Sequence, residues 1–223
     1  MAAVRKRSAL QLAAISGHLQ TVKLVDGSGD AALTALFVAA KTGHADVVKL
    51  LMKRGASAVA ADEAGWTAAT KAAELGYRAV VKAFLKSATA AEIVNMQLPS
   101  GTTALNIACE RGHMDVVVAL VNAGADLELA DTDGCTPLTT AAQLGYSDIV
   151  QLLVNRGANV NGRLPSGGTA LLTAVWHKRV AVVRILLDNG ADLDDGGGVA
   201  TRKDGTSGCP APPPSCTYRE RPL

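Results

Sequence analysis

The sequence predicts an all-α solenoid, in which short helix pairs stack into an elongated array. Three observations support this prediction: a pattern that recurs about every 33 residues, short apolar stripes at helical spacing, and an alanine-rich composition with only 3% aromatic residues. A hydrophobic fraction of 48% supplies enough apolar surface for a core. Because large rings are scarce, that core must form by close approach of small side chains between thin layers.

The recurring pattern is a small hydroxyl residue, a small residue and usually leucine, followed by an alanine-rich helix and usually a glycine. Its occurrences begin at Ser8, Thr34, Thr67, Thr103, Thr136 and Thr169. The intervals between these positions are 26, 33, 36, 33 and 33 residues. We therefore predict one repeat array over residues 1–195, with about six helix-turn-helix units.

The second of these units illustrates how one repeat is expected to fold. Thr34 is predicted to cap a first helix that ends at Gly43, and a second helix follows until Gly55. Both helices carry apolar residues at helical spacing. A single helix pair cannot bury these apolar faces, so neighbouring units must stack to complete the core.

The period and three local sequences resemble the ankyrin repeat, whose signature is Thr-Pro-Leu-His-x-Ala. The three sequences are Thr34-Ala35-Leu36, Thr136-Pro137-Leu138 and Thr169-Ala170-Leu171, and the resemblance covers roughly residues 8 to 195. It implies hairpin-like fingers between the units. It also implies a protein-interaction scaffold or adaptor that binds a protein partner through its concave face.

Several departures from the family pattern are expected to have structural consequences. The histidine after leucine is absent from every unit, so part of the bonding between units is expected to be lost. The short first interval predicts a truncated first unit around Asp26 to Asp30, and the long interval predicts an irregular finger around Thr89 to Gln97. Lys178 stands where the last unit needs a glycine for a left-handed turn.

The resemblance also implies which residues contact a partner: the residue before each capping threonine and the two residues before the first-helix glycine. Carried across, these are Leu33, Lys41, Thr42, Trp66, Glu74, Leu75, Thr102, Glu110, Arg111, Cys135, Gln143, Leu144, Trp176 and His177. We predict that Trp66→Ala weakens capture of the partner at least about tenfold and leaves the unfolding midpoint nearly unchanged, and that Trp176→Ala acts in the same direction. In the alternative, Trp66 covers the irregular finger and Trp176 covers the solenoid end, and both rings are structural.

No catalytic residue, metal site or cofactor is predicted. His18, His44 and His113 occupy one repeat position, directly after a glycine, so we expect a role at the turn rather than a shared metal ion. The four cysteines lack metal-ligand spacing, and no phosphate-binding loop or hydrolase motif occurs. We therefore predict that the protein is not an enzyme.

The remaining predictions concern partners, location and the end of the chain. A net charge of +2, balanced over the repeats, argues against nucleic-acid binding, and no stretch reaches the about twenty apolar residues of a membrane span. We predict a monomer in the cytoplasm, with the nucleus as a second candidate location. Residues 196–223, rich in Gly, Pro and Ser, are predicted to form a disordered tail. An alternative left open is a non-catalytic fragment of a longer multidomain ankyrin protein.

Overall fold

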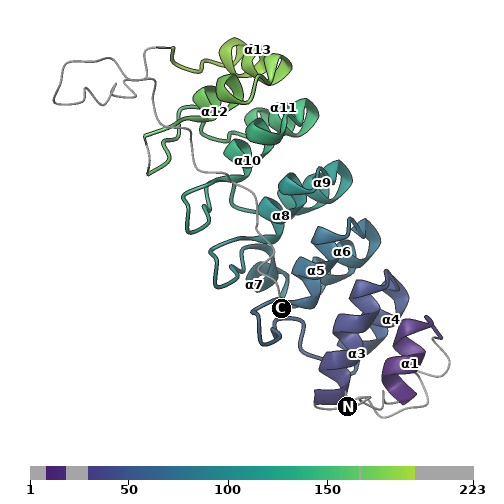
Figure 1. Cartoon of the computed structure of the whole chain (residues 1–223). Helices are drawn as coiled ribbons and strands as arrows, with labels where there is room; N and C mark the ends of the chain where they lie inside the picture. The colour runs from purple at the N-terminus through teal and green to yellow at the C-terminus, as the bar shows by residue number, and fades with distance from the viewer. Residues whose placement is uncertain (1–8, 19–29, 166, 194–223) are drawn as a thin grey trace, which may run out of the picture.

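The computed structural model describes residues 9–18, 30–165 and 167–193, and in these ranges helix pairs stack into an elongated array (Figure 1). The first helices of the pairs, here called inner helices, lie on the side from which the fingers project. They are α3 (Asp30–Lys41), α5 (Ala68–Glu74), α8 (Ala104–Glu110), α10 (Pro137–Leu144) and α12 (Ala170–Trp176). The second, or outer, helices are α4 (Ala45–Lys53), α6 (Arg78–Phe84), α9 (Met114–Asn122), α11 (Ser147–Asn155) and α13 (Val180–Asp188).

Two further helices complete the described part of the chain. Helix α1 (Ala9–Ile15) packs against α3 at one end of the array, and α7 (Ala90–Val94) lies in the connection between α6 and α8. The predicted all-α repeat fold is thus confirmed. The predicted start at Ser8, residues 26–29 of the expected truncation and the predicted tail lie outside the described residues.

Four inner helices begin at the predicted threonine caps. The hydroxyl oxygen of each cap accepts a hydrogen bond from the backbone N–H three residues later, at 3.1 to 3.3 Å. These caps are Thr67, Thr103, Thr136 and Thr169. A proline follows only one of them, at the first position of α10, where its missing N–H costs nothing.

Thr34 was predicted to be a cap, and that prediction is wrong. Helix α3 begins at Asp30, so Thr34 lies inside the helix. The residues from Asp30 to Leu33 include neither proline nor glycine, and an aspartate is favourable at a helix N-terminus. The helix therefore extends past the position at which the other units begin theirs.

The turn between the two helices of a unit uses a left-handed residue that the next unit covers. Gly76 has φ of 74°, and a Cβ atom added there would lie 2.8 Å from the ring of His113 in the following unit. Gly112 has φ of 72° and is covered in the same way by Tyr146, again at 2.8 Å. Lys178 replaces this glycine in the last described unit with φ of 58°, the only positive φ at a non-glycine residue of the described chain. The predicted left-handed lysine is confirmed.

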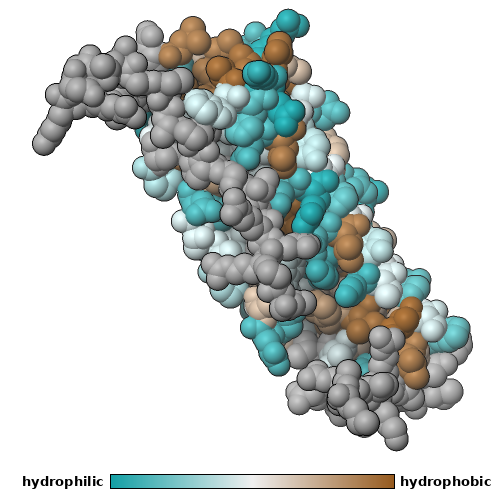
Figure 2. Space-filling model, viewed as in Figure 1, coloured by the Kyte–Doolittle hydropathy of each residue, from teal (hydrophilic) through white to brown (hydrophobic). Residues whose placement is uncertain are grey.

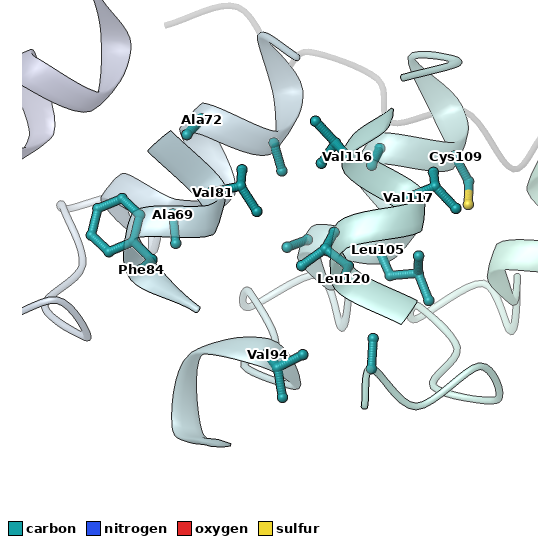
Figure 3. Close-up of a cluster of buried hydrophobic side chains, with 14 of the residues drawn as sticks. Ala69, Ala72, Val81, Phe84, Val94, Leu105, Cys109, Val116, Val117 and Leu120 are labelled. Atoms are coloured by element: carbon teal, nitrogen blue, oxygen red, sulfur yellow. The ribbon is translucent and has the colours of Figure 1, made fainter. Parts of the chain in front are cut away.

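The core is a continuous layer of small side chains between the inner helices, backed by larger ones from the outer helices. The residue pairs that lie four and three positions before the turn glycines are fully buried, as in Ala72-Ala73, Ala108-Cys109 and Ala141-Ala142. Figure 3 shows buried side chains of two neighbouring units, with Val81 of α6 on the side that faces Val116 and Leu120 of α9. The thin core predicted from the alanine content is confirmed.

The fingers contain isolated antiparallel bridges rather than strands within the described ranges. These bridges join Ala61 to Thr67, Gln97 to Thr103 and Arg163 to Thr169. The connection with three extra residues forms α7, so its predicted irregularity is confirmed. No described helix is both long and apolar enough to cross a bilayer.

Asn106, which stands where the family pattern has a histidine, still forms hydrogen bonds between units. Asn106 Nδ2 donates to the carbonyl oxygens of Leu129 at 3.3 Å and Cys135 at 3.2 Å, which belong to the next finger. Thr70 and Thr139, at the same repeat position, instead donate to the carbonyl of their own cap residue at 3.0 and 2.9 Å. The expected loss of bonding therefore does not extend to the Asn106 position, because an amide reaches further than a hydroxyl.

Candidate partner-binding surface

The two residues before each inner-helix turn form two parallel lines along the array, since equivalent positions of stacked units lie side by side. We call these lines the contact rows. The first contact row is Lys41, Glu74, Glu110, Gln143 and Trp176, and the second is Thr42, Leu75, Arg111, Leu144 and His177.

Most of the contact-row residues have solvent-exposed surface. Lys41 and Arg111 are exposed, and Leu75 and Trp176 are 39% and 42% exposed although they are large and apolar. Thr42, Glu74, Glu110, Leu144 and His177 are half-buried. Gln143 is buried, so its side chain offers little surface to a partner.

Three charged residues link two neighbouring units on this surface. Glu74 accepts hydrogen bonds from Lys71 Nζ at 2.6 Å and from a guanidinium nitrogen of Arg111 at 3.1 Å. Lys71 Nζ also lies 4.6 Å from the centre of the Trp66 ring, within the range of a cation–π contact. The carboxylate of Glu74 is thus neutralised within the chain, and it holds the Arg111 side chain in a defined orientation.

The predicted finger positions differ from the contact rows because their side chains are buried. Trp66 is 8% exposed and forms a small cluster with Leu98 of the irregular finger and with Ile107. Thr102 and Cys135 are also buried, at 5% and 0% exposure. For Trp66 this burial favours the structural alternative, in which the ring covers the finger, over a partner contact. The side chain of Leu33 lies outside the described part of the structure.

Two of the histidines stabilise contacts between units. His44 Nε2 donates to the carbonyl of Ile15, and His113 Nε2 donates to the carbonyl of Glu74, both at 2.9 Å. Arg179 occupies the same repeat position and donates through Nε to the carbonyl of Gln143 at 2.9 Å. Each accepting carbonyl is near the C-terminal end of an earlier helix, α1, α5 or α10, where backbone oxygens lack helical partners. The predicted role of these histidines at the turn is confirmed.

Tyr77, Tyr146 and Arg179 were not identified from the sequence as equivalent to these histidines. All three occupy the same repeat position, and each covers the turn glycine of the preceding unit. Tyr77 packs over Gly43 of the preceding unit, where an added Cβ atom would lie 3.4 Å from the ring, just as Tyr146 packs over Gly112. Their place in the repeat could have identified them, because each of these residues directly follows the left-handed residue of its own unit. The chemistry differs between units, so only the repeat register identifies them as equivalent.

Two described residues have clearly shifted pKa values, and burial is the main cause of both shifts. Burial raises the pKa of the Cys109 thiol far above its usual range, so the reactive thiolate is suppressed. Burial also raises the pKa of Asp131, partly offset by backbone N–H donors, including those of Cys135 and Asp133. These bonds fix the finger loop around the carboxylate. Among the described residues, no three His, Cys, Asp or Glu side chains are grouped as metal ligands.

Comparison with known families matches this arrangement along nearly all of the described helices. A family model described as ankyrin repeats (3 copies) matches residues 10–95, 91–163 and 130–196. No curated protein matches the chain significantly.

Proposed function

This chain belongs to the ankyrin-repeat family, and on that premise we propose that it is a scaffold which binds a protein partner through its concave face, along the contact rows. Ankyrin repeats are generally protein–protein interaction modules. Stacked repeats suit this role because they present an extended surface that many side chains line at regular intervals.

The observation that carries the proposal is the contrast between adjacent positions of the inner helices. The pairs Ala39-Ala40, Ala72-Ala73 and Ala141-Ala142 are fully buried and nearly uniform from unit to unit, because packing demands small side chains there. The contact-row residues that follow immediately vary from Lys41 to Trp176. Packing does not require this variety, whereas recognition of one specific partner does.

The chemistry of the exposed contact-row residues indicates the kind of partner. Leu75 and Trp176 supply apolar anchors, and Lys41 and Arg111, which lie on the contact rows one unit before and one unit after Leu75, supply cations. Apolar and aromatic side chains typically form the centre of a protein interface, with charged groups at its rim. We expect a partner that presents apolar side chains with neighbouring carboxylates.

The test compares substitutions on the contact rows with a matched substitution on an outer helix. Lys41→Glu reverses a charge on an inner helix, and Lys82→Glu makes the same change at an exposed position of α6. Partners are captured from source-cell extract with the wild-type chain, identified by mass spectrometry, purified and titrated against each variant. Lys41→Glu and Leu75→Ser are expected to weaken binding at least about tenfold, equal to about 1.4 kcal/mol, and Lys82→Glu to leave it unchanged.

Circular dichroism provides the control for folding, since all three positions are exposed and their substitution should leave helix content and unfolding midpoint unchanged. A partner whose affinity falls with Lys82→Glu but not with the contact-row variants binds the outer helices instead. That result would refute the proposed binding face.

A further inference from the structure

Basic side chains are concentrated on the outer helices of two neighbouring units, α4 and α6. We call this surface the basic face and define it by five exposed residues: Lys49, Lys53, Arg78, Lys82 and Lys86. The two stretches that contain these helices, 45–54 and 77–86, hold six basic residues and one acidic residue. The remainder of the chain has more acidic than basic residues, so the nearly balanced total charge conceals a local excess of positive charge.

The helical register places these cations on one side of two adjacent helices. Lys53 follows Lys49 by about one turn of α4. Lys82 follows Arg78 in the same way in α6, and each pair is therefore about 6 Å apart along its helix. Lys82 and Lys86 occupy the same repeat positions as the two α4 lysines, one unit later. Because α4 and α6 pack side by side, with axes about 8 to 10 Å apart, the cations form a two-dimensional array.

Little negative charge on the described chain opposes this array. Asp46 is the one acidic residue of the two stretches, and it pairs with Lys49 at 2.9 Å. The other four cations of the basic face form no salt bridge with any residue that the structure describes. Asp115 lies on the next outer helix, α9, beyond the basic face. The described residues therefore leave most of this positive charge uncompensated.

The composition of the basic face indicates which kind of anionic partner it fits. Lysine is depleted at protein–protein interfaces, whose centres are apolar or aromatic. Helices α4 and α6 expose no large apolar side chain, whereas several such side chains are exposed on α12 and α13, toward the far end of the array (Figure 2). Base stacking on single-stranded nucleic acid requires free aromatic rings. The ring nearest in sequence, that of Tyr77, packs over Gly43 of the preceding unit.

We propose that the basic face docks the chain on a membrane surface that is rich in anionic phospholipids. Lipid headgroups present a planar array of negative charges, which the cations of two side-by-side helices can approach together. Each Lys or Arg near such a surface strengthens binding about fivefold. Lysine is a flexible point charge, so it can follow mobile headgroups without a fixed bonding geometry. The contact rows lie on the inner helices, so this docking is independent of the protein partner proposed for them.

The test measures cosedimentation of the full chain with lipid vesicles. Vesicles of equal parts phosphatidylserine and phosphatidylcholine should bind the chain at low salt, and vesicles of phosphatidylcholine alone should not. High salt should release the chain, because it screens charges. Lys82→Gln combined with Lys86→Gln should lower the partition coefficient about 25-fold. The matched control, Lys178→Gln combined with Arg184→Gln, removes two exposed cations from the last unit and should bind as the wild type does.

Folding and the binding face are controlled separately. The substituted positions are exposed, so each double variant should keep the wild-type circular dichroism spectrum and unfolding midpoint. Lys53→Gln, on the other helix, is an independent variant that should weaken vesicle binding about fivefold. Leu75→Ser, on the contact rows, should leave vesicle binding unchanged.

Competitors distinguish the possible sources of negative charge. Duplex DNA or polyglutamate, added at the charge concentration of the phosphatidylserine, should leave most of the chain on the vesicles. Displacement by either competitor would assign the basic face to nucleic acid or to an acidic protein segment and overturn the proposal. So would an absence of binding at low salt, or an equal loss of binding in the Lys178 and Arg184 control.

Discussion

The close packing of each turn glycine under the next unit gives a sharp prediction for Gly76→Ala. The residue has φ of 74°, and an alanine Cβ would lie 2.8 Å from Nδ1 and Cε1 of His113. The imidazole cannot simply rotate away, since its Nε2 is bonded to the carbonyl of Glu74 at 2.9 Å. The substitution therefore combines backbone strain with a displaced ring.

The magnitude follows from these two effects. A non-glycine residue in the left-handed region costs about 1 to 2 kcal/mol, and losing the His113 hydrogen bond costs about 0.5 to 1.5 kcal/mol more. We expect Gly76→Ala to lower the free energy of unfolding by about 2 to 3 kcal/mol. The smaller conformational entropy of alanine in the unfolded chain offsets part of this loss.

Gly124→Ala is the matched control. Gly124 has φ of 85°, but nothing lies within 4 Å of the position of its Cβ atom. Both alanine variants share the backbone strain of the left-handed conformation and the reduced entropy of the unfolded chain, and only Gly76→Ala displaces His113. Gly124→Ala should therefore lose about 1 kcal/mol less stability than Gly76→Ala.

The assay is urea unfolding followed by circular dichroism, with both alanine variants made in the wild-type and His113→Ala backgrounds. Removing the imidazole should reduce the cost of Gly76→Ala to that of Gly124→Ala, because space then becomes available. Equal losses for the two glycines in the wild-type background would refute the steric argument.

Three other predictions concern buried residues. Trp66→Ala should lower the free energy of unfolding by about 3 to 5 kcal/mol, measured by urea unfolding, since the ring is 8% exposed against Leu98 and Ile107; an unchanged midpoint would contradict this role. Asn106→Thr should cost about 1 to 2 kcal/mol in the same assay, because a hydroxyl can still cap the helix but cannot reach the next finger, and full stability would show that those bonds contribute nothing. Cys109 should resist alkylation by iodoacetamide at pH 8 in the folded chain and react after unfolding in urea, as mass spectrometry of the peptide would show; rapid labelling of the native thiol would disprove its burial.

The sequence determined the features that depend on local chemistry. A threonine hydroxyl satisfies the free N–H groups at a helix start wherever a helix begins at that residue, so the caps from Thr67 to Thr169 were predictable. The left-handed turns followed equally from the glycines and from Lys178. Alanine pairs at one repeat position predicted the thin core, because only close stacking can bury them.

The tertiary structure decided whether a side chain is buried or exposed at positions where the sequence allowed both. Trp66 could face a partner or its own finger, and the presence of Leu98 and Ile107 beside it determined that it is buried. Tyr146 and His113 differ in chemistry, yet both cover the glycine of the preceding unit. Val175 continues a row of buried residues and is exposed only because no described residues cover the last unit. In each case the outcome depends on a neighbour some thirty or more residues away, or on its absence, which the chemistry of the residue itself does not encode.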